Sequence, residues 1–108
     1  MANRSHVLLN AVAATGAGTG FLCDLVRNQE GCFTVEYVGT LGTLTVVLEG
    51  RAVPGTGEWI KIAEIAHASI PVGYKGHAIA VTLLPEMRAN CTVYTGGSLT
   101  SATAKLIQ

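Results

Sequence analysis

The chain has 108 residues, which is enough for one domain with a single hydrophobic core but too few for two. Seven basic and seven acidic residues give a formal net charge of zero, so no basic field attracts a phosphate backbone, and we expect no nucleic-acid partner. Only 13% of the residues are charged while 49% are hydrophobic, so we expect other subunits to cover part of the surface.

The N-terminal residues bear on whether the chain enters a membrane or a secretion pathway. No apolar run in the sequence approaches the roughly 20 residues needed to cross a bilayer, so we expect no membrane partner. Residues 7–9 follow Arg4 and faintly resemble a signal peptide. Because Asn10 interrupts the apolar run and glycines follow, we reject that interpretation. We interpret residues 1–5 as a short extended arm and residues 6–14 as a first strand or a short helical turn.

The first third of the chain contains two further candidate strands. Residues 21–26 form an apolar run that ends at a polar stretch. Residues 32–38 alternate, with Phe33, Val35 and Tyr37 on one side and polar residues on the other. A two-residue period predicts a pleated strand with one buried face.

A hairpin is predicted in the middle of the chain, and its first arm is residues 43–49. Leu44, Val46 and Leu48 fall on one side of this segment. Residues 54–57, Pro-Gly-Thr-Gly, then break it, because proline fixes φ and glycine allows a left-handed backbone. The break predicts a turn that leads into an antiparallel second arm.

The second arm of the hairpin is residues 59–65, which are rich in residues that fill sheet faces. It begins with Trp59, the only tryptophan, which we interpret as a core anchor. A helix is the alternative, because Trp59, Ile62 and Ala66 share one helical face. The β-type sequence on both sides favours the strand.

The last third of the chain predicts three more strands. Residues 77–84 alternate and are stopped by Pro85, and residues 87–94 alternate again. Gly96-Gly97 suits a tight hairpin, after which residues 99–107 return with small and apolar side chains on one side. Seven or eight short strands with frequent turn signals predict an all-β fold, an antiparallel β-sandwich or barrel in which residues 1–108 form a single domain.

One segment resembles the phosphate-binding loop of a dinucleotide-binding enzyme. Residues 16–20 are rich in glycine, and Glu36 follows at about the distance of a ribose-binding acid. The spacing fails, because Phe21 occupies the position of the third glycine, and the chain is too short for the parallel β-α units that such a loop requires. We therefore expect no nucleotide cofactor.

The sequence shows no constellation for catalysis or metal binding. The three histidines, His6, His67 and His77, are far apart and lack the i, i+4 pairing of a helical zinc site. No serine or cysteine is accompanied by a base and an orienting group. We therefore expect no enzyme activity, no catalytic residue, no metal site and no cofactor.

The cysteines are odd in number and have no metal-type spacing. Cys23, Cys32 and Cys91 are interpreted as small buried hydrophobes of a protein made in a reducing cytosol. A disulfide from Cys23 to Cys32 is the alternative.

Three aromatic residues raise the possibility of sugar binding. Trp59, Tyr74 and Tyr94 could form a platform on which a glycan stacks, although Trp59 beside an apolar strand is better explained as a core anchor. Tyr74, in the loop at residues 72–77, is the stronger candidate for surface contact. A carbohydrate-binding β-sandwich module is thus the alternative to a structural protein.

Several segments also follow a recognisable order. Residues 8–16 have the form Leu-Leu-x-Ala-x-x-Ala-Thr-Gly, and a Gly-rich loop and Trp-led strand follow at residues 50–62. Residues 85–89 have the form Pro-x-x-Arg-Ala and are followed by a strand, the turn at Gly96-Gly97 and a final strand. This layout resembles the small β-sandwich virion structural proteins of tailed bacteriophages, although the loop before Trp59 lacks their common Asp-Gly pair.

The resemblance implies a non-enzymatic structural protein, made in the host cytoplasm and located in the virion. Its implied role is capsid decoration, with the major capsid protein or other virion subunits as partners and with its own copies in a homo-oligomer; a small tail component is the alternative. No catalytic residue is carried over. The residues that we expect at the assembly interface come from the arm and from the 72–77 loop: Ala2, Asn3, Arg4, Ser5, His6, Tyr74, Lys75 and His77.

Overall fold

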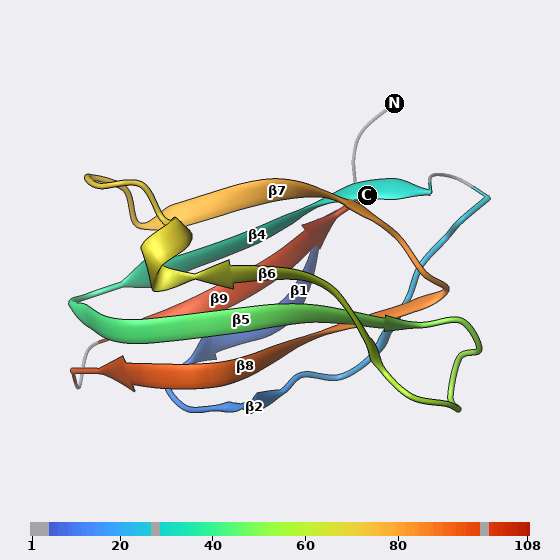
Figure 1. Ribbon diagram of the computed structural model, residues 1–108, viewed down its shortest axis with the longest axis horizontal. Coiled ribbons are helices and arrows are strands. Elements are labelled where there is room, and N and C mark those ends of the chain that lie inside the picture. Colours follow the sequence, from blue (N-terminus) through green and yellow to red (C-terminus); the bar gives the residue numbers. More distant parts are fainter. Residues whose placement is uncertain (1–4, 27–28, 98–99) are drawn as a thin grey trace.

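The computed structural model describes residues 5–26, 29–97 and 100–108, which form two antiparallel β-sheets packed face to face (Figure 1). The four-stranded sheet has the order β1-β9-β4-β7, and the five-stranded sheet has the order β2-β8-β5-β6, with β3 also paired to β8. The strands of the four-stranded sheet are β1 (Ser5–Val12), β9 (Ser101–Ile107), β4 (Glu30–Val38) and β7 (Gly76–Thr82). Those of the five-stranded sheet are β2 (Gly16–Ala17), β8 (Glu86–Gly96), β5 (Leu41–Arg51), β6 (Ile60–Ala66) and β3 (Phe21–Leu22).

The all-β antiparallel fold predicted from the sequence is confirmed. Of the two arrangements that the sequence allowed, the structure is the sandwich, because the strands divide into two separate sheets. The first apolar run, residues 6–14, lies mainly in strand β1, so the helical-turn alternative is wrong there. In the second run, residues 21–26, only Phe21–Leu22 are a strand.

The central hairpin forms between β5 and β6, as predicted. Leu44, Val46 and Leu48 are buried on the inner side of β5. In the connection, Gly55 and Gly57 have φ of 81° and 88°, values that favour glycine. The helix alternative for the second arm is wrong, because β5 provides hydrogen-bond partners along β6, and one 3-10 turn, η1 (His67–Ser69), follows only where β6 ends.

The core lies between the two sheets. It is built from the residues that face inward at alternate positions along the strands of both sheets. Met87, Ala89 and Cys91 are buried on β8, as the predicted alternation of residues 87–94 requires, but the alternation fails at Val93, which is 43% exposed beyond a register shift against β5. The largest fully buried side chains are Phe33, Leu44, Leu48, Ile65, Met87, Leu106, Val35, Val46 and Cys91. All three cysteines are free, so the proposed Cys23–Cys32 disulfide is not formed.

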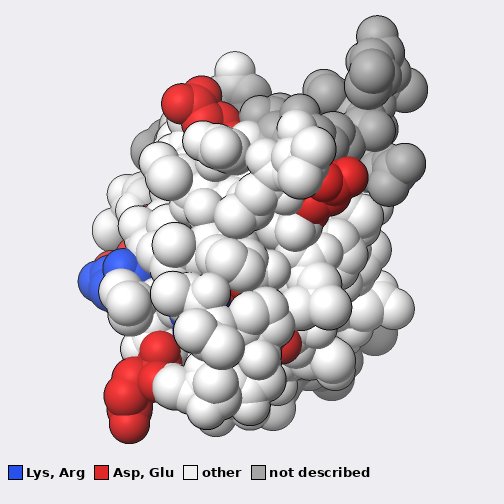
Figure 2. All heavy atoms as spheres, turned by 90° about the vertical axis from the view of Figure 1, so that its right-hand side faces the viewer, with Lys and Arg blue, Asp and Glu red and all other residues white. Residues whose placement is uncertain are grey.

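The surface carries few charged groups. Figure 2 shows one end of the sandwich, where separate carboxylates lie among mostly uncharged side chains. None of the residues that the structure describes forms a helix long and apolar enough to span a membrane.

Candidate functional site

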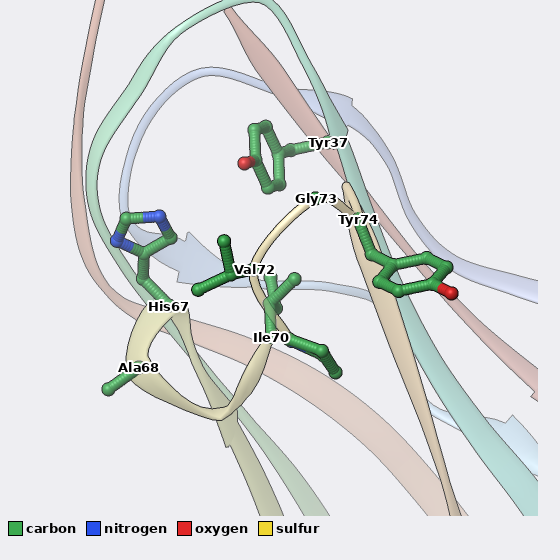
Figure 3. Close-up of a pocket in the computed structure, with 8 residues that line it drawn as sticks. Tyr37, His67, Ala68, Ile70, Val72, Gly73 and Tyr74 are labelled. Carbon is green, nitrogen blue, oxygen red and sulfur yellow. The ribbon is translucent and has the colours of Figure 1, made fainter.

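A hollow of about 370 Å³ lies at the end of the sandwich where η1 and the connection to β7 cross the chain (Figure 3). Part of its wall is a short loop that contains two successive turns, each closed by a backbone hydrogen bond. Ile70 N–H donates to the His67 carbonyl at 3.1 Å, and Tyr74 N–H donates to the Pro71 carbonyl at 3.1 Å. Gly73, with φ of 91°, allows the second turn. The lining residues are Tyr37, His67, Ala68, Ile70, Pro71, Val72, Gly73 and Tyr74.

The hollow combines aromatic and aliphatic walls with a few polar groups. The rings of Tyr37 and His67 meet edge to face, with centroids 6.1 Å apart. Figure 3 shows Val72 beside these two rings and the Tyr74 ring turned away from them. Lys75 Nζ lies 5.9 Å from the Tyr37 ring centroid and donates to the Gly39 carbonyl at 3.1 Å. Such a surface can hold an apolar or aromatic group and offers a hydroxyl and an imidazole at its rim.

Trp59 does not anchor the core, and this prediction is wrong. Its side chain is half-buried on the outer side of the five-stranded sheet, where the guanidinium carbons of Arg51 and Arg88 both lie 4.3 Å from its ring centroid. The reason is a bulge in β6, which pairs Leu48 with Ala63 but Glu49 with Lys61, so that one extra residue enters the strand. Because the extra residue reverses the alternation, Trp59 faces outward while Ile65 faces the core.

Two ion pairs lie beside Trp59 on the outer side of β5 and β8. Arg88 Nε donates to Glu49 Oε1 at 2.7 Å, and Arg51 Nε donates to Glu86 Oε1 at 2.6 Å. The same Glu86 oxygen accepts the Gly55 backbone N–H at 3.0 Å. These bonds attach the β5–β6 connection to β8, and the hydrogen bond from Arg51, followed by that from Gly55, lowers the pKa of the Glu86 carboxyl.

The residues predicted for an assembly interface lie in separate places. Ala2, Asn3 and Arg4 lie outside the described residues. Ser5 and His6 begin β1 at one end of the sandwich, where the His6 ring lies 3.9 Å from that of Phe21. Tyr74 and Lys75 precede β7 at the opposite end, and His77 is in β7 (Figure 1). Tyr74, Lys75 and His77 therefore lie together at one end of the sandwich, whereas Ser5 and His6 lie at the other end.

The three aromatic residues considered for a glycan platform have three different surroundings. Trp59 lies against two arginines, while Tyr94 donates its hydroxyl to the Thr100 carbonyl at 2.7 Å and is half-buried. Of these three residues, only Tyr74 lines the end hollow, which Tyr37 and His67 also line. Sequence reasoning missed this grouping, because Tyr37 belongs to β4 and no local pattern predicts that η1 crosses its end.

Metal-ligating clusters and the cysteine thiols were the remaining candidates for a chemically active site. Among residues 5–26, 29–97 and 100–108, no group of three His, Cys, Asp or Glu side chains could hold a metal ion. Burial raises the pKa of the Cys23 thiol to about 11 and also raises the pKa of Cys91. Both thiols are therefore protonated at neutral pH, and a thiol in this form is a poor nucleophile.

Comparison with known proteins yields one distant likeness in shape. No family model matches the sequence, and no curated protein matches it. Among solved structures, the chain is similar to the crystal structure of the SPBc2 prophage-derived protein YomS, with 12% sequence identity and a TM-score of 0.48, over 99% of this chain and 94% of that chain. A likeness this distant carries no conclusion about what the present chain does.

The position of Trp59 predicts a modest cost for its removal. Trp59→Ala loses two cation–π contacts and should lower the free energy of unfolding by about 1–2 kcal/mol. Phe33→Ala, which removes a fully buried ring, should cost about 3–5 kcal/mol. Urea unfolding of both variants measures the difference. Equal losses in the two variants would contradict the outward position of Trp59.

The lowered pKa of Glu86 predicts a pH dependence. Because its pKa is lower in the folded protein than the ordinary value of 4.5, its stabilising contribution is present above that value and is lost as pH falls through the folded-state pKa. Glu86→Gln should therefore show a smaller loss of stability than the wild type when the pH is lowered from about 6 to about 3. Glu58→Gln, an exposed carboxylate of the same connection, is the control for loss of one negative charge. Parallel wild-type and Glu86→Gln curves would exclude this role of Glu86.

Proposed function

We propose that the protein is a non-enzymatic structural protein of a tailed-phage virion, where it acts as a capsid decoration protein. In this role it is made in the host cytoplasm and then binds the major capsid protein and its own copies. The order of sequence segments that resembles small β-sandwich virion proteins supports the class, and the low fraction of charged residues supports a surface that is covered in an assembly. A small tail component is the closest variant of this proposal.

The observation that carries the proposal is the exposure of apolar side chains at both ends of the sandwich. Val26 and Val72 are fully exposed, and Tyr74 is 69% exposed. Covering apolar surface contributes about 25 cal/mol per Å², so contacts at these ends would favour association. The end with the β5–β6 connection exposes Leu22, Val26, Val53 and Ile60, and the opposite end exposes Val38, Val72 and Tyr74.

The ion pairs on the outer side of β5 and β8 support a structural role. Glu49 and Arg88 bind each other across β5 and β8, and Arg51 binds Glu86. Glu86 also holds the β5–β6 connection through Gly55. These side chains use their hydrogen-bonding capacity to hold strands and a loop in place.

Attachment to particles tests the proposal. Purified protein added to virions that lack it should bind to saturation, and deletion of residues 1–5 should weaken this binding while leaving the circular dichroism spectrum and the melting temperature of the free protein nearly unchanged. Occupancy is measured by quantitative gel analysis of sedimented particles. Failure of the full-length chain to bind heads or tails at any concentration would refute the virion role.

A carbohydrate-binding module is the second candidate, and the end hollow favours it. Tyr37, His67 and Tyr74 line a space of about 370 Å³ with aromatic faces and polar rims, a combination that suits a sugar ring. Binding of the isolated chain to a glycan array, lost in Tyr74→Ala and kept in Trp59→Ala, would favour this candidate over the structural role. Loss in Trp59→Ala alone would assign glycan binding to the outer face of the five-stranded sheet instead.

A further inference from the structure

The edges of the two sheets differ in how they are protected. An edge strand presents unpaired N–H and C=O groups, and proteins usually protect such edges with charges, proline, bulges or short strands. The edges of the four-stranded sheet are β1 and β7, and those of the five-stranded sheet are β6 on one side and the two-residue strands β2 and β3 on the other.

Three of these edges carry a protecting feature. Strand β1 has two register shifts against β9, and Ala11 within it has φ of 50°. Strand β2 is only two residues long. Strand β6 contains the bulge described above and carries the ion pair of Lys61 with Glu64. Each of these features works against the addition of another strand.

Strand β7 has none of these protections. Its sequence, Gly-His-Ala-Ile-Ala-Val-Thr, contains no Lys, Arg, Asp, Glu or Pro. Over all seven residues, each of which the structure describes, it pairs with β4 in a constant register from Glu30 opposite Thr82 to Glu36 opposite Gly76. In Figure 1, β7 forms the upper margin of its sheet, and it is the last strand in the sheet order. The strand is thus a regular and uncharged edge.

The register of β7 against β4 determines which backbone N–H and C=O groups of β7 have no partner on β4; we call the residues that carry these groups open. At the two ends of the ladder, Tyr37 N–H donates to the Lys75 carbonyl and Leu83 N–H donates to the Gln29 carbonyl, both at 2.9 Å. Because residues of an antiparallel strand face their partner alternately, the odd-numbered residues of β7 bond to β4. The residues whose N–H and C=O groups point away from β4 are therefore Gly76, Ala78, Ala80 and Thr82.

We propose that β7 pairs with β7 of a second copy of this chain, antiparallel and about a two-fold axis at Ile79. Full overlap of the open residues places Ala78 opposite Ala80 of the second copy and Gly76 opposite Thr82 of the second copy. Ile79 then faces its own copy as a non-hydrogen-bonded pair. The pairing joins two four-stranded sheets into one continuous sheet, and it deepens the self-association part of the proposed function, on which it rests.

The chemistry of β7 favours a second copy as the occupant. Self-pairing places no like charges opposite each other, because the strand has no charged side chain. Ile79 is half-buried at the rim of the core, and its copy would cover it. The nearest carboxylates, Glu30 and Glu36, are on β4. In the paired sheet, Glu30 of one copy and Glu36 of the other are separated by three strand spacings, from β4 through the two β7 strands to the second β4, or about 14 Å. This distance exceeds the screening length of roughly 8 Å at physiological salt.

A proline on the open edge tests the pairing without breaking the internal ladder. Sedimentation equilibrium of the wild-type chain should show a dimer. Ala80→Pro removes an N–H that points away from β4, and Ala80→Lys adds a charge at the edge. Each should raise the dimer dissociation constant by more than about tenfold, a loss of 1.4 kcal/mol or more. Val93→Lys, which adds the same charge on the outer face of the other sheet, should leave it unchanged.

Cross-linking tests the register. In a background with Cys23→Ser, Cys32→Ser and Cys91→Ala, the Ile79→Cys variant should form a disulfide-linked dimer under mild oxidation, because a non-hydrogen-bonded pair has a Cα separation of about 4.5 Å. Ala80→Cys in the same background should not cross-link, because its copy lies diagonally at about 7–8 Å. Near-identical circular dichroism spectra of both variants and the background chain serve as the check on folding. Efficient cross-linking through Ala80→Cys but not Ile79→Cys would overturn the proposed register.

The outcomes separate this inference from the proposed function. A wild-type chain that is monomeric at high concentration overturns the β7 pairing, and if Ala80→Pro then also loses attachment to particles, the edge belongs to a strand of another virion protein. A chain that dimerises through β7 but never binds particles supports the pairing and refutes the virion role. Undiminished dimerisation of Ala80→Pro overturns the pairing whatever the particles show.

Discussion

The structure depends on the burial of one face of β5. This strand lies in the interior of the five-stranded sheet, between β8 and β6, and Leu44, Val46 and Leu48 on its inner side are almost completely enclosed. Because a strand alternates with a period of two, burying these three residues also fixes what faces outward, including Glu49 and Arg51. The hydrophobic face of β5 therefore sets both the core and the position of the ion pairs on the opposite side.

Bulges in the neighbours of β5 change which residues reach the core. The bulge in β6 reverses its alternation, so that Trp59 turns outward to Arg51 and Arg88. A register shift in β8, where Val46 pairs with Cys91 but Thr45 pairs with Val93, has the same local form. An extra residue costs ladder hydrogen bonds but allows a strand to bury one set of side chains at one end and a different set at the other.

The two functional ideas use different parts of the same neutral sandwich. The end hollow with Tyr37 and His67 offers a concave surface for a small group, while β7 offers a straight and uncharged edge for another strand. Neither feature is covered by charged side chains of its own strand or loop turns, in keeping with the small number of charged residues in the chain. This shortage is the physical link between the composition and the proposed assembly role.

The sequence by itself determined the class of fold and most strand positions, because alternation and turn residues act locally: Phe33 and Val35, for example, are buried as their spacing predicted. The tertiary structure alone decided the sandwich over the barrel, the outward position of Trp59 and the meeting of Tyr37 with His67. Strand pairing is set by contacts between residues far apart in the sequence, and a bulge depends on the partner strand as much as on its own residues. A two-residue period therefore predicts that a strand has two faces, but which face is buried changes wherever its partner imposes an extra residue.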